Sequence, residues 1–125
     1  MADLTLQRIP FSKEADSRLR MLKARTGITP NYLCRLGFCL SLDEPGLPEA
    51  PDAAAEQGRE INRFTLLGQY DSAFVGLLKV WMQGQELEQQ KAAQIDKFFI
   101  AHMNRGIELM VARIKTLADM SSLCR

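Results

Sequence analysis

The stretch "RIPFSKEADSRLRMLKARTGITPNYLCRLGFCLSL", residues 8–42, decides how this chain folds. It holds two segments in which apolar residues recur at helical spacing, and Gly27 separates them. Ser12 is a favourable N-cap and glycine is favourable directly after a helix end, so the first segment predicts a helix over residues 13–26. A Thr-Pro pair is typical of a helix start and predicts a second helix over residues 30–42. The connection of about three residues predicts a tight helical hairpin.

A short extended segment precedes this hairpin. Residues 4–11, "LTLQRIPF", are rich in apolar types and have a proline near their end, which favours a strand. Their alternation is imperfect, because the leucines at 4 and 6 would share one face while Ile9 and Phe11 belong to the other. Two interpretations stay open: a bulge shifts the register, or only half of the segment pairs.

The rest of the chain predicts a mainly α protein, and its 125 residues fit a single domain. Residues 43–60 lose the helical periodicity and gain prolines and acidic side chains, which indicates a surface loop. The mixed pattern at residues 61–71 is compatible with a short strand or a helical turn. Residues 74–82 are apolar on most sides and predict a helix that is buried between others or at a subunit contact. A helical repeat over residues 92–117 predicts a long last helix.

Charge is distributed unevenly along the chain. The formal net charge is only +1, so a nucleic-acid role must come from charge placed locally. Residues 1–42 carry seven Lys and Arg against three Asp and Glu, residues 43–60 carry one against six, and residues 61–125 carry eight against six. The first third is therefore basic and the segment after it is acidic.

The cysteines indicate a reducing environment. Cys34, Cys39 and Cys124 are odd in number and include no C-x-x-C pair, so neither a disulfide framework nor a zinc site is predicted. Free thiols suit the cytosol. The N-terminus lacks the pattern of a secretory signal, and the apolar runs are far shorter than a membrane span. We therefore expect a soluble cytoplasmic protein with no membrane partner.

No catalytic centre, cofactor site or metal site is predicted. The chain has one histidine and no glycine-rich phosphate loop, and no Asp, Glu or His cluster has the spacing of metal ligands, which leaves little support for a nuclease. His102 borders an apolar stripe, which favours a structural histidine. Trp81 with Met82, and Phe98 with Phe99, could stack on bases, but their helical spacing favours core packing.

The basic flanks of the helix at 13–26 are the remaining candidate site. Its carboxylates, Glu14 and Asp16, lie only in the first turn, so the cations that follow have few acidic partners four residues away. This weak neutralisation favours a phosphate-binding surface. The alternative, an ordinary solvated helix face, stays open.

The order of a short strand, a helix ended by glycine and a second helix opened by Thr-x-Asn is similar to the ribbon-helix-helix proteins. In those proteins the strands of two chains pair into a ribbon that enters the major groove. The resemblance implies that outward strand residues touch bases. Here these would be Thr5 and Gln7, or Leu6 and Arg8.

Three separated blocks carry a resemblance over nearly the full length. They are "LKARTGITPNYLCRLGFCLSLDEPG" at 22–46, "NRFTLLGQYDSAFVGLL" at 62–78 and "AHMNRGIELM" at 101–110. Together they resemble the DndE family, the small E component of the bacterial DNA phosphorothioation system. The resemblance implies a part in replacing a non-bridging phosphate oxygen of DNA with sulfur, alongside a cysteine desulfurase and an iron-sulfur and ATPase pair. It also implies a DNA-binding, oligomeric subunit with a ribbon-helix-helix-like core.

We therefore expect a non-enzymatic subunit that grips double-stranded DNA by its backbone, with a preference for nicked duplexes. Residues 1–42 would bind DNA, residues 43–60 would form the acidic loop, and residues 61–125 would form a homo-oligomer, expected to be a tetramer. Other proteins of the modification complex would be partners. The competing hypothesis is a helical adaptor that assembles the enzymes without binding DNA. The expected phosphate contacts are Lys13, Arg18, Arg20, Lys23 and Arg25, with Arg8 and Arg35.

Overall fold

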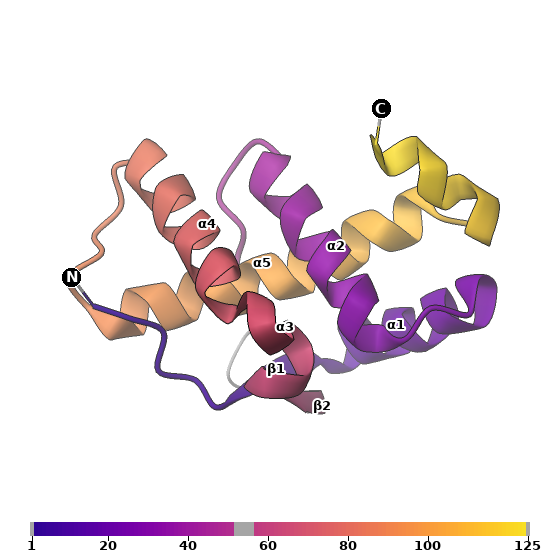
Figure 1. Cartoon of the computed structure of the whole chain (residues 1–125), viewed down its shortest axis with the longest axis horizontal. Helices are drawn as coiled ribbons and strands as arrows, with labels where there is room; N and C mark the ends of the chain where they lie inside the picture. The colour runs from indigo at the N-terminus through magenta and orange to yellow at the C-terminus, as the bar shows by residue number, and fades with distance from the viewer. Residues whose placement is uncertain (1, 52–56, 125) are drawn as a thin grey trace.

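The structure is a computed structural model that describes residues 2–51 and 57–124. It is mainly helical, as the sequence predicts. The longest helix, α5, runs along the length of the molecule, and α1, α2 and α4 contact it (Figure 1). No helix in these two ranges is long and apolar enough to cross a membrane. The elements in chain order are β1 (Arg8–Ser12), α1 (Lys13–Thr26), α2 (Pro30–Asp43), β2 (Gln57–Asn62), α3 (Arg63–Leu67), the 3₁₀ helix η1 (Gly68–Tyr70), α4 (Asp71–Gly84), α5 (Ala92–Arg113) and the 3₁₀ helix η2 (Leu117–Cys124).

The core forms around α5 because its apolar residues recur every four positions on the face that meets the other helices. Phe99, Met103 and Ile107 follow one another at this spacing and are fully buried. Phe38 of α2 packs on Phe99 with ring centroids 5.2 Å apart. The helical repeat predicted from residue 92 is confirmed, although α5 ends at Arg113.

Two glycines let α2 and α5 cross with their backbones in contact. A Cβ built on Gly37 would lie 2.8 Å from the carbonyl carbon of Gly106. A Cβ on Gly106 would lie 2.2 Å from the carbonyl carbon and oxygen of Gly37. Real Cβ atoms do not approach other atoms so closely, so glycine is required at this crossing. The crossing brings the basic N-terminal half and the C-terminal helix into one core.

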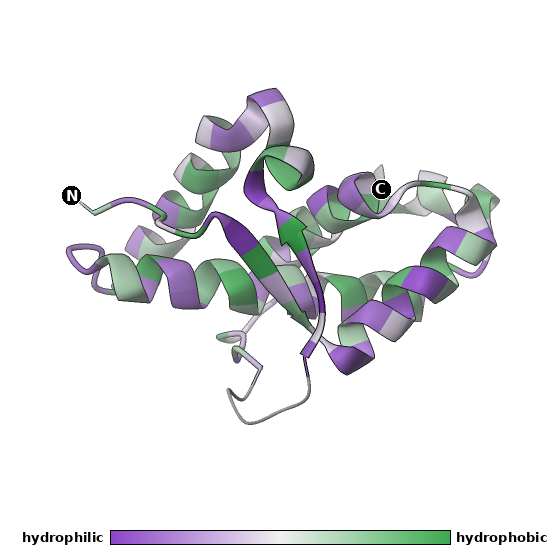
Figure 2. Cartoon of the chain, turned by 90° about the horizontal axis from the view of Figure 1, so that it is seen from below, coloured by the Kyte–Doolittle hydropathy of each residue, from purple (hydrophilic) through white to green (hydrophobic). Residues whose placement is uncertain are grey.

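The predicted strand pairs within the chain. β1 and β2 form an antiparallel ribbon with Ile9 opposite Ile61 and Ser12 opposite Gln57. In Figure 2 this ribbon lies in front of α5, and its lower end leads into α1. Pairing begins at Arg8, so only half of residues 4–11 pairs, and the register also shifts at a bulge between Pro10 and Ser12.

The other edge of β1 is closed by a side chain of α5. Asn104 accepts a hydrogen bond from the backbone N–H of Ser12 (3.0 Å) and donates one to the carbonyl oxygen of Pro10 (3.3 Å). These bonds occupy the groups that a neighbouring strand would use. The ribbon-helix-helix arrangement, in which this edge pairs with a second chain, is therefore not confirmed. What remains of that prediction is a short strand followed by two helices.

The predicted hairpin has the expected bounds because its signals are local. Ser12 Oγ accepts a hydrogen bond from the Ala15 N–H (3.1 Å), and Gly27 ends α1 with a left-handed backbone, φ 75°. The two alternatives at residues 61–71 are both present, since Ile61 lies in β2 and α3 begins directly after it.

The prediction of a loop over residues 43–60 needs correction at both ends. β2 begins at Gln57, and α2 extends through Asp43. The start of this stretch is held against α5, because Arg105 donates to the carbonyl oxygens of Glu44 (3.3 Å) and Gly46 (2.9 Å). Part of the predicted loop, residues 52–56, lies outside the described residues.

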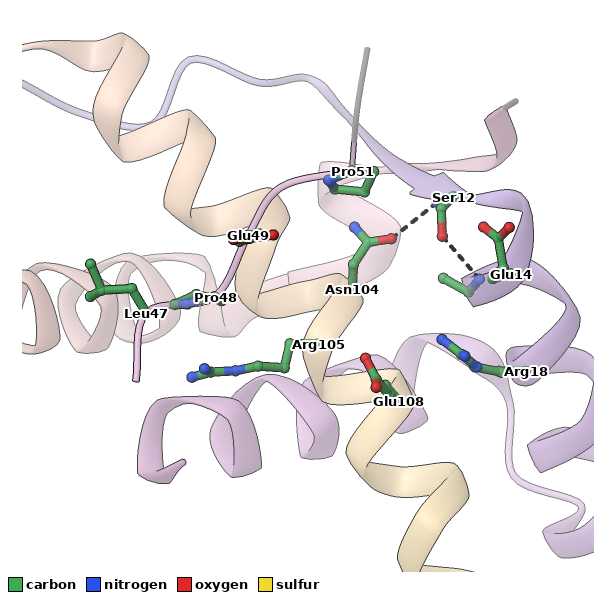
Figure 3. Close-up of a pocket in the computed structure, with 11 residues that line it drawn as sticks. Ser12, Glu14, Arg18, Leu47, Pro48, Glu49, Pro51, Asn104, Arg105 and Glu108 are labelled. Carbon is green, nitrogen blue, oxygen red and sulfur yellow. Dashed lines mark hydrogen bonds between the residues drawn. The ribbon is translucent and has the colours of Figure 1, made fainter. Parts of the chain in front are cut away.

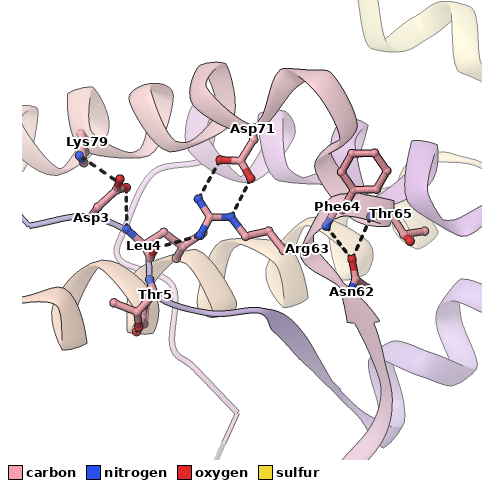
Figure 4. A network of polar contacts seen from close by, with 10 residues as sticks. Asp3, Leu4, Thr5, Asn62, Arg63, Phe64, Thr65, Asp71 and Lys79 are labelled. Atoms are coloured by element: carbon pink, nitrogen blue, oxygen red, sulfur yellow. Dashed lines mark hydrogen bonds and ion pairs between the residues drawn. The ribbon is translucent and has the colours of Figure 1, made fainter.

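A polar network holds the N-terminal segment across α3 and α4 (Figure 4). Arg63 donates two hydrogen bonds to the carboxylate of Asp71 (2.6 and 2.7 Å) and one to the carbonyl oxygen of Leu4 (2.8 Å). Lys79 lies 3.9 Å from the Asp3 carboxylate. The hydrogen bonds from Arg63 hold the pKa of Asp71 below its usual value. The segment before β1 is thus fixed without being a strand.

Candidate nucleic-acid interface

The cations of α1 lie on two flanks of its buried stripe. Ala15, Leu19 and Leu22 form the stripe and are buried. One flank carries Arg18 and Arg25, and the other carries Lys13, Arg20 and Lys23. The two flanks contact different parts of the chain. The five cations that the sequence predicts as phosphate contacts therefore do not all share the same surroundings.

The flank of Arg18 and Arg25 faces groups of the same chain. Arg25 donates a hydrogen bond to the carbonyl oxygen of Ile114, just after α5 (3.2 Å). Arg18 lines an open hollow of about 460 Å³ that also contains three glutamates (Figure 3). Its lining residues are Ser12, Glu14, Ala15, Arg18, Leu47, Pro48, Glu49, Pro51, Asn104, Arg105 and Glu108. The acidic segment therefore lies beside Arg18, and carboxylates here oppose an incoming phosphate.

The opposite flank opens on a second hollow of about 660 Å³ between α1 and β2. Asp16 is the only carboxylate among the described residues that line it. Lys23 lies further along the same flank and is exposed. We call this hollow the basic hollow, and its lining residues are Lys13, Asp16, Ser17, Arg20, Gln57, Gly58 and Arg59.

Asp16 holds two arginines at the floor of the basic hollow. Its side chain is only 10% exposed, and it accepts hydrogen bonds from Arg59 Nε (2.7 Å) and Arg20 Nη2 (3.2 Å), one on each oxygen. The sequence predicts few acidic partners four residues away from these cations. Arg20 has one such partner, Asp16. One carboxylate shared by two guanidinium groups leaves an excess of positive charge.

Arg59 is the residue that sequence reasoning missed, because it lies in the stretch predicted to be an acidic loop. Two residues of β2, Gly58 and Arg59, stand opposite the single residue Phe11 of β1, which is a bulge. A Cβ on Gly58 would lie 2.6 Å from the Cβ of Asp16, so glycine permits β2 to approach α1. The bulge and the close approach together bring Arg59 to Asp16.

The last two candidate residues lie apart from α1. Arg8 is exposed on β1, opposite Asn62. Arg35 of α2 donates from Nε to the carbonyl oxygen of Leu66 (2.7 Å), and its guanidinium lies 5.0 Å from the ring centre of Tyr32 and 5.9 Å from that of Tyr70. Arg35 thus joins α2 to α3, and the structure does not bring it together with the basic hollow.

The groups considered for catalysis and base stacking are buried, except Trp81, which is half-buried against the core. His102 is fully buried, with Nδ1 2.8 Å from Ser41 Oγ, and the ring of Trp81 lies perpendicular to it at 4.2 Å. Burial, and secondarily the positive charge of Arg105, lowers the pKa of His102 to about 3. Phe98 and Phe99 are buried, so the core interpretation of both is confirmed. Within residues 2–51 and 57–124, no three His, Cys, Asp or Glu side chains are grouped to hold a metal ion.

Comparisons with known proteins agree with this architecture. The crystal structure of DndE from Escherichia coli B7A, a protein involved in DNA phosphorothioation modification, superposes with a TM-score of 0.66 at 26% identity, covering 87% of this chain and 99% of that one. A glycine-to-lysine variant of DndE has the same fold, with a TM-score of 0.62 at 24% identity, covering 85% of this chain and 97% of that one. No curated protein matches the sequence significantly. The family model of DndE, described as a DNA sulphur modification protein, matches residues 8–117, and the chain therefore belongs to the DndE family.

Proposed function

We propose that this protein is a DNA-binding accessory subunit of the phosphorothioation machinery. It acts in the cytoplasm, grips the duplex backbone largely independently of sequence and carries out no chemistry itself. Other proteins of the modification complex supply the catalysis and are its protein partners. Membership of the DndE family supports the link to DNA sulphur modification.

The basic flank of α1 and the basic hollow carry the proposal. Lys13, Arg20 and Lys23 project from one flank of a helix, and Arg59 joins them from β2. Phosphate contacts by Lys and Arg release counterions and give affinity that falls steeply with salt. Such contacts position a protein on DNA without reading its bases. The proposed phosphate contacts also include Arg8, Arg18, Arg25 and Arg35. These contribute less to the affinity for DNA, because carboxylates or backbone carbonyls surround most of them.

Oligomerisation would multiply this weak site. α4 carries an exposed apolar side that includes Leu77 (47% exposed) and Val80 (69%), and Phe64 of α3 is 78% exposed. Apolar side chains of this size at the surface favour a protein contact. We propose that α3 and α4 form the contact of a homo-oligomer, with a tetramer as the expected assembly, so that several basic hollows act on one duplex.

The experiment measures binding of the purified protein to a duplex by fluorescence anisotropy over a series of salt concentrations. Removing two phosphate contacts with R20Q/K23Q is expected to reduce the slope of log K against log salt by about 2. The control K91Q/K97Q removes the same charge from exposed positions of the segment before α5 and of α5 itself, and is expected to leave the slope unchanged.

A third double variant, R18Q/R25Q, tests the other flank and is expected to change the slope by less than R20Q/K23Q. If the two α1 variants and the α5 control all behave like the wild type while DNA still binds, the phosphate contacts lie elsewhere. If the wild type binds no duplex even at low salt, the adaptor hypothesis replaces DNA binding.

A further inference from the structure

Arg35 and two tyrosines form a partly exposed surface between α2 and η1. Arg35 donates from Nε to the carbonyl oxygen of Leu66 (2.7 Å), which fixes its guanidinium. The guanidinium carbon lies 5.0 Å from the ring centre of Tyr32 and 5.9 Å from that of Tyr70. The two tyrosines are 54% and 50% exposed, so large parts of both rings reach solvent. We call these three side chains the tyrosine site.

Gly68 leaves room for this arrangement. Its backbone has a φ of 56°, and a Cβ at this position would lie 3.1 Å from Nη2 of Arg35. Another residue here would be strained by its backbone and would press on the guanidinium. The turn from α3 into η1 thus lets Tyr70 and Arg35 approach each other.

We propose that the tyrosine site binds an unpaired nucleobase of DNA, which stacks on a tyrosine ring while Arg35 contacts a phosphate of the same strand. This inference rests on the proposed DNA binding and adds a second site, formed by elements other than α1 and β2. A paired base exposes only its edges in the grooves, so a fully paired duplex cannot use the tyrosine site.

The charge of the site favours a nucleotide. Among residues 2–51 and 57–124, Arg35 forms no ion pair with a carboxylate, and its side chain donates only the hydrogen bond to Leu66. Both terminal NH₂ groups are therefore left for an anion. The phosphates that flank an unpaired base supply this anion next to the ring that stacks. The guanidinium also attracts the face of the base itself.

The aromatic side chains that the sequence suggests for base stacking are unsuitable, because Phe98 and Phe99 are buried. Tyr32 and Tyr70 are instead about half exposed and lie against a fixed cation. Stacking on an aromatic ring requires no particular base, because every base has a π face. The site therefore agrees with DNA binding that is largely independent of sequence.

The fold connects the tyrosine site to the basic hollow. β2 begins at that hollow with Gln57 and leads directly into α3, and Leu66 of α3 holds Arg35. A DNA molecule held at the hollow can therefore present an unpaired base to the tyrosine site. The residues on which the proposed oligomer contact rests, Phe64, Leu77 and Val80, are not part of this site.

The test uses the full-length protein and three duplexes of one sequence. One is fully paired, one has an extra adenosine in one strand, and in the third this extra nucleotide lacks its base. The two bulged duplexes interrupt the helix at the same place and differ only in the base. By fluorescence anisotropy at one salt concentration, we expect the adenosine bulge to bind about tenfold more tightly than the abasic bulge, because one base gains a stacking contact.

Tyr32→Leu and Tyr70→Leu each remove a ring and keep an apolar side chain, so each should abolish most of this preference. Tyr32→Phe keeps the ring and should retain the preference. The control Leu117→Ala changes an exposed side chain of η2 and should also retain it.

Equal affinity of the wild type for the two bulges would overturn the inference, as would a preference that survives in both leucine variants. If Tyr32→Leu instead changes the oligomeric state, measured by light scattering, and keeps the preference, the site is a protein contact and the inference is wrong. These results leave the proposed DNA binding intact as long as the paired duplex binds in a salt-sensitive manner. Failure of the wild type to bind any of the three duplexes would refute DNA binding itself, and this inference with it.

Discussion

Substituting Gly106 by alanine should destabilise this protein, although alanine normally favours a helix. A methyl group at this position would lie 2.2 Å from the carbonyl carbon and oxygen of Gly37 and 2.8 Å from the backbone nitrogen of Phe38. Ordinary contact begins at 3.4 Å, so the methyl group is more than 1 Å too close to backbone that cannot rotate away. α2 and α5 must separate to accommodate it.

The magnitude follows from two opposing terms. Inserting a methyl group into a packed core lowers the free energy of unfolding by up to about 3 kcal/mol. We take this upper value because separation of α2 from α5 also pulls apart the side chains around Phe38 and Phe99. The helix propensity of alanine offsets about 1 kcal/mol of this. The free energy of unfolding of G106A should therefore be about 2 kcal/mol below that of the wild type.

Urea unfolding followed by far-UV circular dichroism measures this difference. The matched control is Gly76→Ala on α4, where, apart from the adjacent backbone of α4, no atom of the described residues lies within 4 Å of the added methyl group. This variant should gain up to about 1 kcal/mol from propensity. If G106A proves as stable as G76A, α2 and α5 do not cross in backbone contact, and the arrangement described above is wrong.

Two further predictions concern buried titratable groups. Because burial lowers the pKa of His102 to about 3, the unfolded chain binds a proton between pH 6.5 and pH 3 that the folded chain does not. The free energy of unfolding should therefore fall as pH decreases through this window, by up to about 1.4 kcal/mol per pH unit. In urea titrations at several pH values, His102→Gln should show a shallower fall. An equal dependence on pH in both proteins would contradict the prediction. Burial raises the pKa of the Cys34 thiol to about 12, so a thiol reagent at neutral pH should label the exposed Cys39 first and Cys34 only after unfolding, as mass spectrometry of the labelled peptides can show. Labelling of Cys34 in the native protein at the rate of Cys39 would contradict its burial.

The parts of the fold that sequence reasoning predicted correctly depend on local signals. The cap at Ser12, the glycine at 27 and the proline at 30 each act within one helical turn, and they give α1 and α2 bounds that agree with the structure. The helical period of α5 could also be predicted from the sequence, because its buried residues repeat over a long helix. The bounds of these helices can therefore be predicted without knowing which element each helix packs against.

The partner of β1 could not be predicted, because it depends on residues far along the chain. β2 begins at Gln57, inside a stretch whose composition indicates a loop, and Asn104 closes the opposite edge of β1 from the last helix. An isolated strand with alternation only over part of its length does not specify which strand it meets. The resemblance to ribbon-helix-helix proteins therefore gave a plausible pairing with a second chain, while the structure uses a segment of the same chain.

Asp16 shows why a candidate site needs both sequence and structure. Counted along the sequence, its carboxylate is a negative charge that weakens a phosphate-binding helix. In the structure it is buried between α1 and β2, where Arg20 and Arg59 already satisfy both of its oxygens. A carboxylate in that position repels an incoming phosphate less than an exposed one, because the two guanidinium groups lie between them and carry the larger charge. Its main effect is then to hold Arg20 and Arg59 in a fixed orientation between α1 and β2, where both still reach solvent.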